Sequence, residues 1–120
     1  MAGPLILNHQ RKISVGIRRL EQFALGLCDR LGIPQSEFTI KLTNDRMIRR
    51  LNSSFRQTDK ATDVLSFRVG PEANRFPNFE NNYLGDIIIS VETAQRQAFD
   101  RNHSLETELG QLLLHGLLHS

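Results

Sequence analysis

The sequence has only one cysteine, Cys28, in its 120 residues, so no disulfide can form within the chain. No apolar run approaches the ~20 residues that a membrane-spanning helix needs. Residues 1–7 have no charged n-region and too short an apolar stretch for a signal peptide. These absences exclude a disulfide framework and an integral membrane helix, and we expect a cytoplasmic protein with no membrane partner.

The composition predicts one globular domain spanning residues 1–120. It is 39% hydrophobic and 23% charged, and no repeat, low-complexity tract or linker divides it. The net charge is only +2, but residues 41–75 contain eight basic and four acidic side chains. This region could present a basic face to the phosphates of a nucleic acid, although a solvated helix face explains its arginines equally well.

Two kinds of hydrophobic period alternate along the chain. A period of two or an apolar run predicts strands at residues 5–8, 38–42, 62–67 and 83–90. Helical spacing predicts four helices, of which the first spans residues 13–31 and the third spans residues 91–99. The second helix is capped by Thr43 or Asn44, and its predicted buried residues are Met47, Ile48, Leu51 and Phe55. The last helix is capped by Ser104. The order β-α-β-α-β-β-α-α predicts an α+β fold, a small mixed four-stranded sheet covered by helices.

The final leucine-rich stretch contains His115 and His119. Residues four apart lie within about 40° of each other around a helix, so both imidazoles could bind one divalent metal ion such as zinc. The leucines predict that this helix, and the pair with it, is buried in the fold. Two hydrogen-bonded core histidines are the alternative, and the spacing by itself does not decide between them.

Three further positions could take part in a site. Arg56, at the start of a predicted loop, could bind a phosphate through two parallel hydrogen bonds, or could be a solvated loop residue. Asp63 could be functional or could cap a turn. Asp86 enters an apolar strand after Gly85, and a Gly-Asp turn is the alternative explanation for that carboxylate.

Together these segments resemble the YbeY endoribonuclease family. The resemblance rests on Arg-Gln-Thr-Asp-Lys-Ala-Thr-Asp-Val-Leu-Ser-Phe at residues 56–67, Leu-Gly-Asp-Ile at 84–87 and His-Gly-Leu-Leu-His at 115–119. It implies a zinc-dependent endoribonuclease that cleaves single-stranded RNA in ribosomal RNA maturation and small-subunit quality control. It also implies that His115 and His119 are metal ligands, that Arg56 binds the RNA phosphate, and that Asp86 contacts a ribosomal protein.

The sequence departs from the family pattern at two places. Ala61 and Arg68 stand where the family often has prolines, which is a conformational difference. The family has a third histidine five residues after the second, and this chain ends at Ser120. We therefore expect a fragment of a longer protein, and we expect this 120-residue chain to bind zinc weakly and to cleave RNA slowly.

The residue after His115 bears on the reaction type. Zinc peptidases with the pattern His-Glu-x-x-His have their general base at that position, whereas this chain has Gly116. The resemblance therefore favours RNA hydrolysis, in which a metal-activated water attacks the phosphodiester, with no base assigned. Another metallohydrolase reaction and a ribosome-binding module with structural zinc remain the alternatives.

Overall fold

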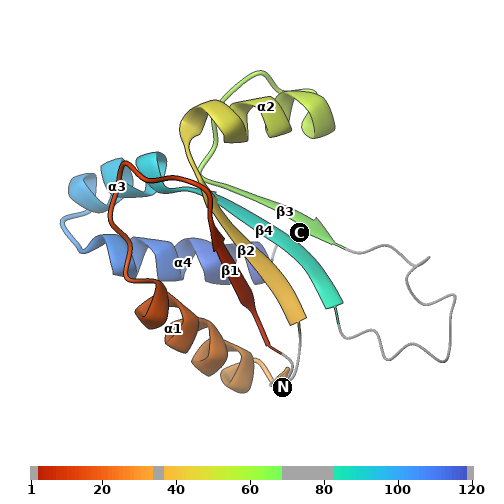
Figure 1. Cartoon of the computed structure of the whole chain (residues 1–120), viewed down its shortest axis with the longest axis vertical. Coiled ribbons are helices and arrows are strands. Elements are labelled where there is room, and N and C mark those ends of the chain that lie inside the picture. The colour runs from red at the N-terminus through yellow and green to blue at the C-terminus, as the bar shows by residue number, and fades with distance from the viewer. Residues whose placement is uncertain (1–2, 34–36, 69–82, 119–120) are drawn as a thin grey trace, which may run out of the picture.

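The computed structural model describes residues 3–33, 37–68 and 83–118, apart from the side chain of Tyr83. The predicted order of elements and the α+β class are confirmed (Figure 1), whereas the loop predicted at residues 69–82 lies outside the described residues. None of the described helices is long and apolar enough to cross a membrane. The elements are β1 (Leu5–Asn8), α1 (Ile17–Arg30), β2 (Glu37–Thr43), α2 (Asp45–Arg56), β3 (Val64–Arg68), β4 (Tyr83–Ser90), α3 (Val91–Asp100) and α4 (Leu105–Leu118).

The four strands form one mixed sheet in the order β1-β2-β4-β3. β1 and β2 are parallel, as are β2 and β4, while β3 runs antiparallel to β4 at one edge of the described sheet. Within the described sheet β3 therefore has a neighbouring strand on one side only, and α2 leads into it through the short segment 57–63 (Figure 1).

The main core lies between one face of the sheet and helices α1, α3 and α4. Side chains of alternate residues on β2 and β4 point into it, as expected for strands with one covered face. Cys28 is buried in this core and is a small hydrophobic residue there. The other buried members include Leu20, Ala24, Phe38, Ile40, Leu42, Ile87, Ile89, Leu109 and Leu113.

Helix α2 covers a smaller area on the opposite face of the sheet. Its contact is centred on Ile48, Leu65 and Ile88, with Leu51 and Phe67 partly buried around them. The predicted buried stripe of this helix is therefore too wide, because Met47 and Phe55 are 44% and 66% exposed. The cap is Asn44 rather than Thr43, since the Asn44 Oδ1 atom accepts a 2.9 Å hydrogen bond from the Met47 amide.

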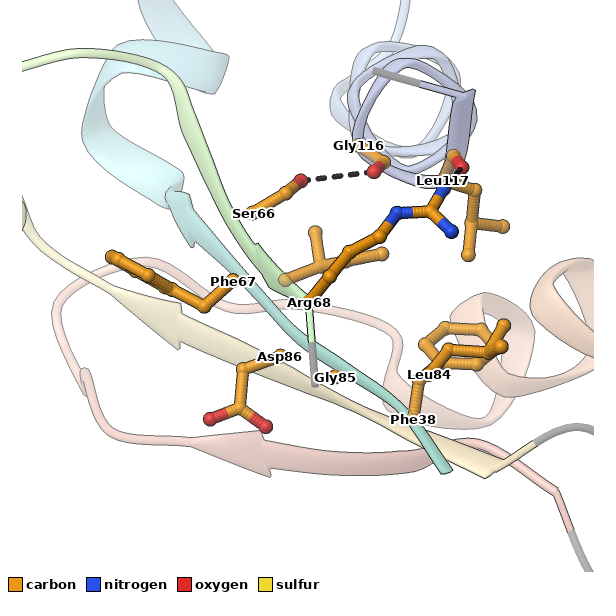
Figure 2. A pocket seen from close by; sticks show the side chains of 10 residues that line it. Phe38, Ser66, Phe67, Arg68, Leu84, Gly85, Asp86, Gly116 and Leu117 are labelled. Atoms are coloured by element: carbon orange, nitrogen blue, oxygen red, sulfur yellow. Dashed lines mark hydrogen bonds between the residues drawn. The ribbon is translucent and has the colours of Figure 1, made fainter. Parts of the chain in front are cut away.

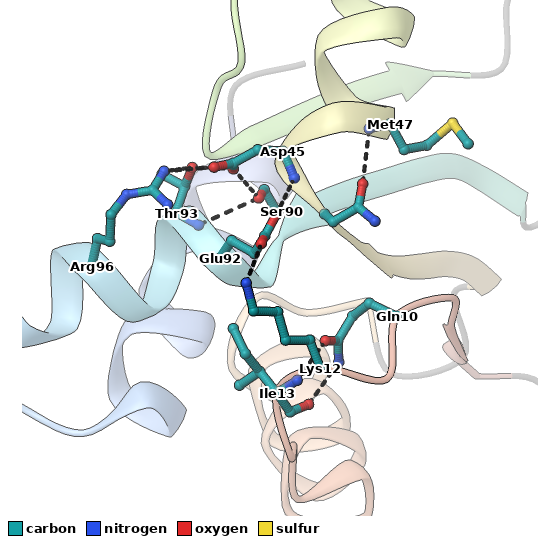
Figure 3. A network of polar contacts seen from close by, with 10 residues as sticks. Gln10, Lys12, Ile13, Asp45, Met47, Ser90, Glu92, Thr93 and Arg96 are labelled. Carbon is teal, nitrogen blue, oxygen red and sulfur yellow. Dashed lines mark hydrogen bonds and ion pairs between the residues drawn. The ribbon is translucent and has the colours of Figure 1, made fainter.

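A network of hydrogen bonds connects the first turn of α2 to the start of α3 (Figure 3). The carboxylate of Asp45 accepts hydrogen bonds from the Ser90 hydroxyl, the Thr93 hydroxyl and the Arg96 guanidinium at 2.5, 2.6 and 2.7 Å. The Asp45 amide in turn donates to Glu92 Oε1 at 2.8 Å. This network fixes where α2 begins, and therefore where its last residue, Arg56, is placed.

Candidate functional site

The end of α4 packs unusually closely against β3 and β4 at Gly116. A Cβ atom at this glycine would lie 2.9 Å from Ile87 Cγ2 and 3.1 Å from Ser66 Oγ, which is closer than side chains normally approach. The Ser66 hydroxyl donates a 2.9 Å hydrogen bond to the Gly116 carbonyl (Figure 2). Gly116 therefore allows the helix to approach the sheet closely.

Arg68 makes a second contact between β3 and the end of α4. Its Nη2 atom donates a 2.8 Å hydrogen bond to the Leu117 carbonyl (Figure 2), in the last turn, where helix carbonyls lack partners within the helix. A guanidinium at this end also interacts favourably with the helix dipole. The residue that replaces a frequent family proline therefore has a structural role here.

The pocket at this contact is too small for a nucleotide. Its volume is about 20 Å³, whereas ligand pockets usually exceed about 300 Å³. Ser66, Arg68, Gly85, Gly116 and Leu117 are among the residues that line it (Figure 2).

His115 is exposed, and not buried as the surrounding leucines predicted. Leu113, Gly116 and Leu117 occupy the face of α4 toward the core and sheet, and at about 100° per residue His115 lies on the far side of the helix from that face. An accessible imidazole suits a zinc ion, so His115 fits the metal that the family resemblance implies. His119 lies outside the described residues, and within those residues no group of three or more His, Cys, Asp or Glu side chains could hold a metal ion.

Arg56 is the last residue of α2, and not part of a loop as predicted. The helix ends there because Gln57 adopts a left-handed conformation, with φ 57°, at its C-cap. The Arg56 Nη2 atom donates a 2.6 Å hydrogen bond to the Ser66 carbonyl. Its guanidinium carbon also lies 5.3 Å from the centre of the Phe67 ring, within the range of a cation–π contact.

Ser66 therefore connects Arg56 to the end of α4. Its carbonyl accepts from Arg56, and its hydroxyl donates to the Gly116 carbonyl, one residue beyond His115. Ser66 is not among the residues that the sequence predicted for the site. The signal that could have found it was a polar residue at an inward position of an apolar strand, together with a glycine in a leucine-rich helix.

Asp86 lies on β4, with its side chain pointing away from α4 (Figure 2). Its Oδ2 atom is 3.4 Å from Lys41 Nζ, and about a third of each side chain is exposed. Gly85 belongs to the same strand and not to a turn. Its φ is +136°, and a Cβ there would come within 2.0 Å of the Phe67 carbonyl oxygen. The carboxylate is therefore presented on the sheet face opposite α4.

Asp63 has a structural role at the start of β3. Its Oδ1 atom accepts a 2.8 Å hydrogen bond from the Val64 amide, and its Oδ2 atom accepts from Gln97 Nε2 at 3.2 Å. Its backbone carbonyl accepts from the Ser90 amide at 2.9 Å. These bonds join the entry of β3 to α3, in keeping with the turn-capping alternative for this residue.

Comparison with known proteins identifies the family of this chain. Three curated endoribonuclease YbeY proteins are similar to this chain. The one from Heliobacterium modesticaldum is 46% identical, over 83% of this chain and 65% of its own length, and the one from Picosynechococcus is 55% identical, over 69% of this chain and 52% of its own length. The one from Aquifex aeolicus is 39% identical, over 95% of this chain and 73% of its own length. The chain thus spans less than two thirds of the first two relatives.

The fold is also similar to a solved structure. The solution structure of a Thermotoga maritima protein superimposes with a TM-score of 0.63 and 26% identity, over 97% of this chain and 70% of that one. The family model described as endoribonuclease YbeY matches residues 5–120. Because that match covers nearly the whole sequence, the chain belongs to the YbeY endoribonuclease family.

Proposed function

We propose that this chain forms the catalytic region of a zinc-dependent endoribonuclease that cleaves single-stranded RNA in ribosomal RNA maturation and ribosome quality control in the cytoplasm. Membership of the family supports an endoribonuclease activity. The observation that carries the proposal is the link through Ser66, which ties Arg56 to the turn of α4 that carries His115. A phosphate-binding cation and a metal-binding imidazole are thus held by one edge strand.

His115 and His119 would hold the zinc ion, and the chemistry that zinc supplies is the activation of a water for attack on phosphorus. The close packing at Gly116 explains why no general base follows the first histidine. A side chain there would collide with Ile87 and Ser66. This arrangement supports RNA hydrolysis over the peptidase alternative, whose base occupies that position.

Arg56 would bind the scissile phosphate. One of its N–H groups is used to anchor the side chain to the Ser66 carbonyl, and the side chain is otherwise exposed. A guanidinium has five N–H donors, so the remaining donors can contact phosphate oxygens. Because the anchor fixes its position in advance, Arg56 would offset the negative charge that develops on the phosphate during attack.

Asp86 would serve a separate purpose. Its carboxylate is on the sheet face opposite α4, so we do not place it in the metal site. A contact with a protein of the small ribosomal subunit agrees with an acidic side chain that is partly exposed beside Lys41. Phe67, which carries Arg56 over its ring, pairs with Asp86 across β3 and β4 on this same face. Ribosome association would therefore use a surface next to the phosphate-binding Arg56, and the metal would be held at the end of α4.

The test compares Arg56→Ala with Arg50→Ala in the zinc-loaded protein. Both changes remove one exposed arginine from α2, but only Arg56 contacts Ser66 and Phe67. We expect Arg56→Ala to lower kcat for single-stranded RNA about 10²- to 10³-fold, and we expect Arg50→Ala to leave kcat at saturating RNA unchanged and to act only on RNA affinity. Unchanged cleavage with lost ribosome association would instead favour a docking module, and cleavage of peptide but not of RNA would favour a peptidase.

A further inference from the structure

The C-terminal end of α2 carries an exposed aromatic residue whose position the proposed reaction does not explain. Phe55 is 66% exposed although it lies at an apolar position of an amphipathic helix. Its ring centre is 5.5 Å from that of Phe67, at an interplanar angle of 71°, which is an edge-to-face contact. Phe55 is therefore held in place by a neighbouring ring and still accessible to solvent.

Phe67 supports both Phe55 and Arg56. Its ring packs against the small core formed by Ile48, Leu65 and Ile88, so it is held by the sheet. The Arg56 guanidinium lies over this ring at 5.3 Å, and the Phe55 ring lies beside it at 5.5 Å. An exposed ring and a phosphate-binding cation are therefore fixed around one partly buried support.

We propose that Phe55 is a stacking site for one nucleobase of single-stranded RNA, next to the phosphate that Arg56 binds, with Phe67 as the residue that positions both. This inference rests on the proposed function. Unpaired bases are commonly bound by stacking on aromatic side chains, while cations bind the backbone. A base in a duplex has both of its faces covered, so the site selects unpaired nucleotides.

The charge of the surrounding surface favours RNA over a protein partner. Helix α2 also exposes Arg46 and Arg50, while its neighbour Arg49 is paired with Asp59 at 2.8 Å. An exposed aromatic ring next to an arginine, on a helix with further exposed arginines, matches the pattern of single-strand binding surfaces. At about 100° per residue Arg46 and Arg50 lie on other sides of the helix from Phe55, so Arg56 is the cation that lies next to the two rings.

The experiment measures binding of two fluorescent probes by anisotropy, without metal so that cleavage does not interfere. One probe is a short single-stranded oligoadenylate, and the other is the same sugar-phosphate chain with abasic nucleotides. We expect Phe55→Ala to weaken oligoadenylate binding about 5- to 150-fold and to leave binding of the abasic probe unchanged. Arg56→Ala should weaken binding of both probes, because it removes a phosphate contact.

Three control variants separate stacking from other effects. Phe55→Tyr keeps an aromatic ring and should restore oligoadenylate binding, whereas Phe55→Leu keeps apolar bulk without a ring and should not. Phe99→Ala removes another exposed phenylalanine, 86% exposed on α3, and should bind both probes like the unmodified chain. If Phe55→Ala weakened the binding of both probes equally, or if Phe55→Leu bound oligoadenylate as tightly as the unmodified chain, the proposal that Phe55 stacks on a base would be wrong.

The same variants distinguish this inference from the proposed function. If Phe55→Ala binds oligoadenylate normally and the zinc-loaded protein still cleaves RNA in an Arg56-dependent way, the stacking site is wrong and the nuclease assignment stands. If Phe55→Ala instead loses association with a purified small-subunit protein and keeps RNA affinity, the ring is a protein-docking residue and the inference is wrong. A base-dependent loss of binding supports the site whatever the cleavage rate.

Discussion

The Ser66 hydroxyl donates a buried 2.9 Å hydrogen bond to the carbonyl of Gly116, a residue 50 positions further along the chain. The bond joins the edge strand β3 to the last turns of α4. Because the carbonyl of the same serine accepts a hydrogen bond from Arg56, the distance between helix and strand also affects the position of the guanidinium. Substitutions that move α4 away from β3 should therefore change the site as well as the stability.

Gly116→Ala should destabilise the protein and lower its cleavage rate. The added methyl group would lie 2.9 Å from Ile87 Cγ2, so α4 must shift away from the sheet. Overpacking lowers the free energy of unfolding by about 1–3 kcal/mol, and the better helix propensity of alanine raises it by about 1 kcal/mol. We expect a net loss of up to about 2 kcal/mol in the free energy of unfolding, measured by urea denaturation.

Gly26→Ala is the matched control for that substitution. Gly26 is an exposed residue in the interior of α1, and a methyl group added there would have no atom outside its own helix within 4 Å. This change should raise stability by up to about 1 kcal/mol through helix propensity. An equal gain from both substitutions would contradict the close approach of α4 to the sheet.

Ser66→Ala should weaken the same contact without adding atoms. The change leaves the Gly116 carbonyl, which lies near the helix end, without the Ser66 hydroxyl. Losing a buried hydrogen bond of this kind costs about 1–3 kcal/mol, and the looser helix should also bind zinc more weakly through His115. Urea denaturation and competition for zinc with a chelator measure the two effects.

The control is Ser54→Ala, which removes an exposed hydroxyl from α2. Stability should stay within about 0.5 kcal/mol of the unmodified chain, as is usual for surface substitutions. If Ser66→Ala behaved in the same way, the hydrogen bond to Gly116 would have no energetic importance, and the link between Arg56 and α4 would lose its physical basis.

The order of strands and helices could be predicted because each element has a clear hydrophobic period. Burial within an element was harder to predict, because it depends on how much surface the neighbouring element covers. Helix α2 touches the sheet through Ile48 and part of Leu51, so two further apolar positions, Met47 and Phe55, stay exposed. The exposed Phe55, which we infer to be a stacking residue, was for this reason predicted to be in the core.

Candidate site residues could be proposed from the sequence only where a residue type suggested its chemistry. Arg56 and His115 were proposed from charge and imidazole spacing, but their local surroundings could not be predicted. Leucines occur on several sides of α4, so the sequence did not show that Gly116 faces the sheet and that His115 is exposed. Ser66 was missed because its two partners are distant in sequence.

Glu108 is another residue whose local surroundings could not be predicted from the sequence, and these surroundings lead to a testable prediction. An acidic residue in the first turn of a helix is usually an exposed partner of the helix dipole, but this carboxylate is fully buried. It pairs with Arg101 Nη1 at 2.8 Å and with His103 Nε2 at 2.5 Å. Glu108→Gln keeps the shape and removes the charge, so we expect a loss of about 1–3 kcal/mol in thermal unfolding experiments.

Glu106→Gln provides the comparison, because Glu106 is exposed in the same first turns of α4. Only its interaction with the helix dipole is lost, so the cost should stay below about 1 kcal/mol. Similar losses for both substitutions would show that the buried pairs with Arg101 and His103 add little beyond the dipole effect.

Asp45 should make the stability of the protein depend on pH. Burial acts to raise the pKa of Asp45, but hydrogen bonds from Ser90, Thr93 and Arg96 outweigh it, and the pKa is lowered overall. A pKa that is lower in the folded state stabilises the fold above the unfolded value of about 4, and this stabilisation is lost as the pH falls through the folded value. Asp45→Asn should therefore be less stable than the unmodified chain at pH 7.

The difference between Asp45→Asn and the unmodified chain should shrink as the pH falls below about 4, because the native carboxylate is then protonated. Urea denaturation across this pH range measures the difference. Asp59→Asn is the control: the pKa of Asp59 is also lowered, by Arg49, but this pair is exposed and screened by solvent, so its effect at pH 7 should be smaller. A constant difference for Asp45→Asn at every pH would mean that shape, and not charge, is what the network at the start of α2 requires.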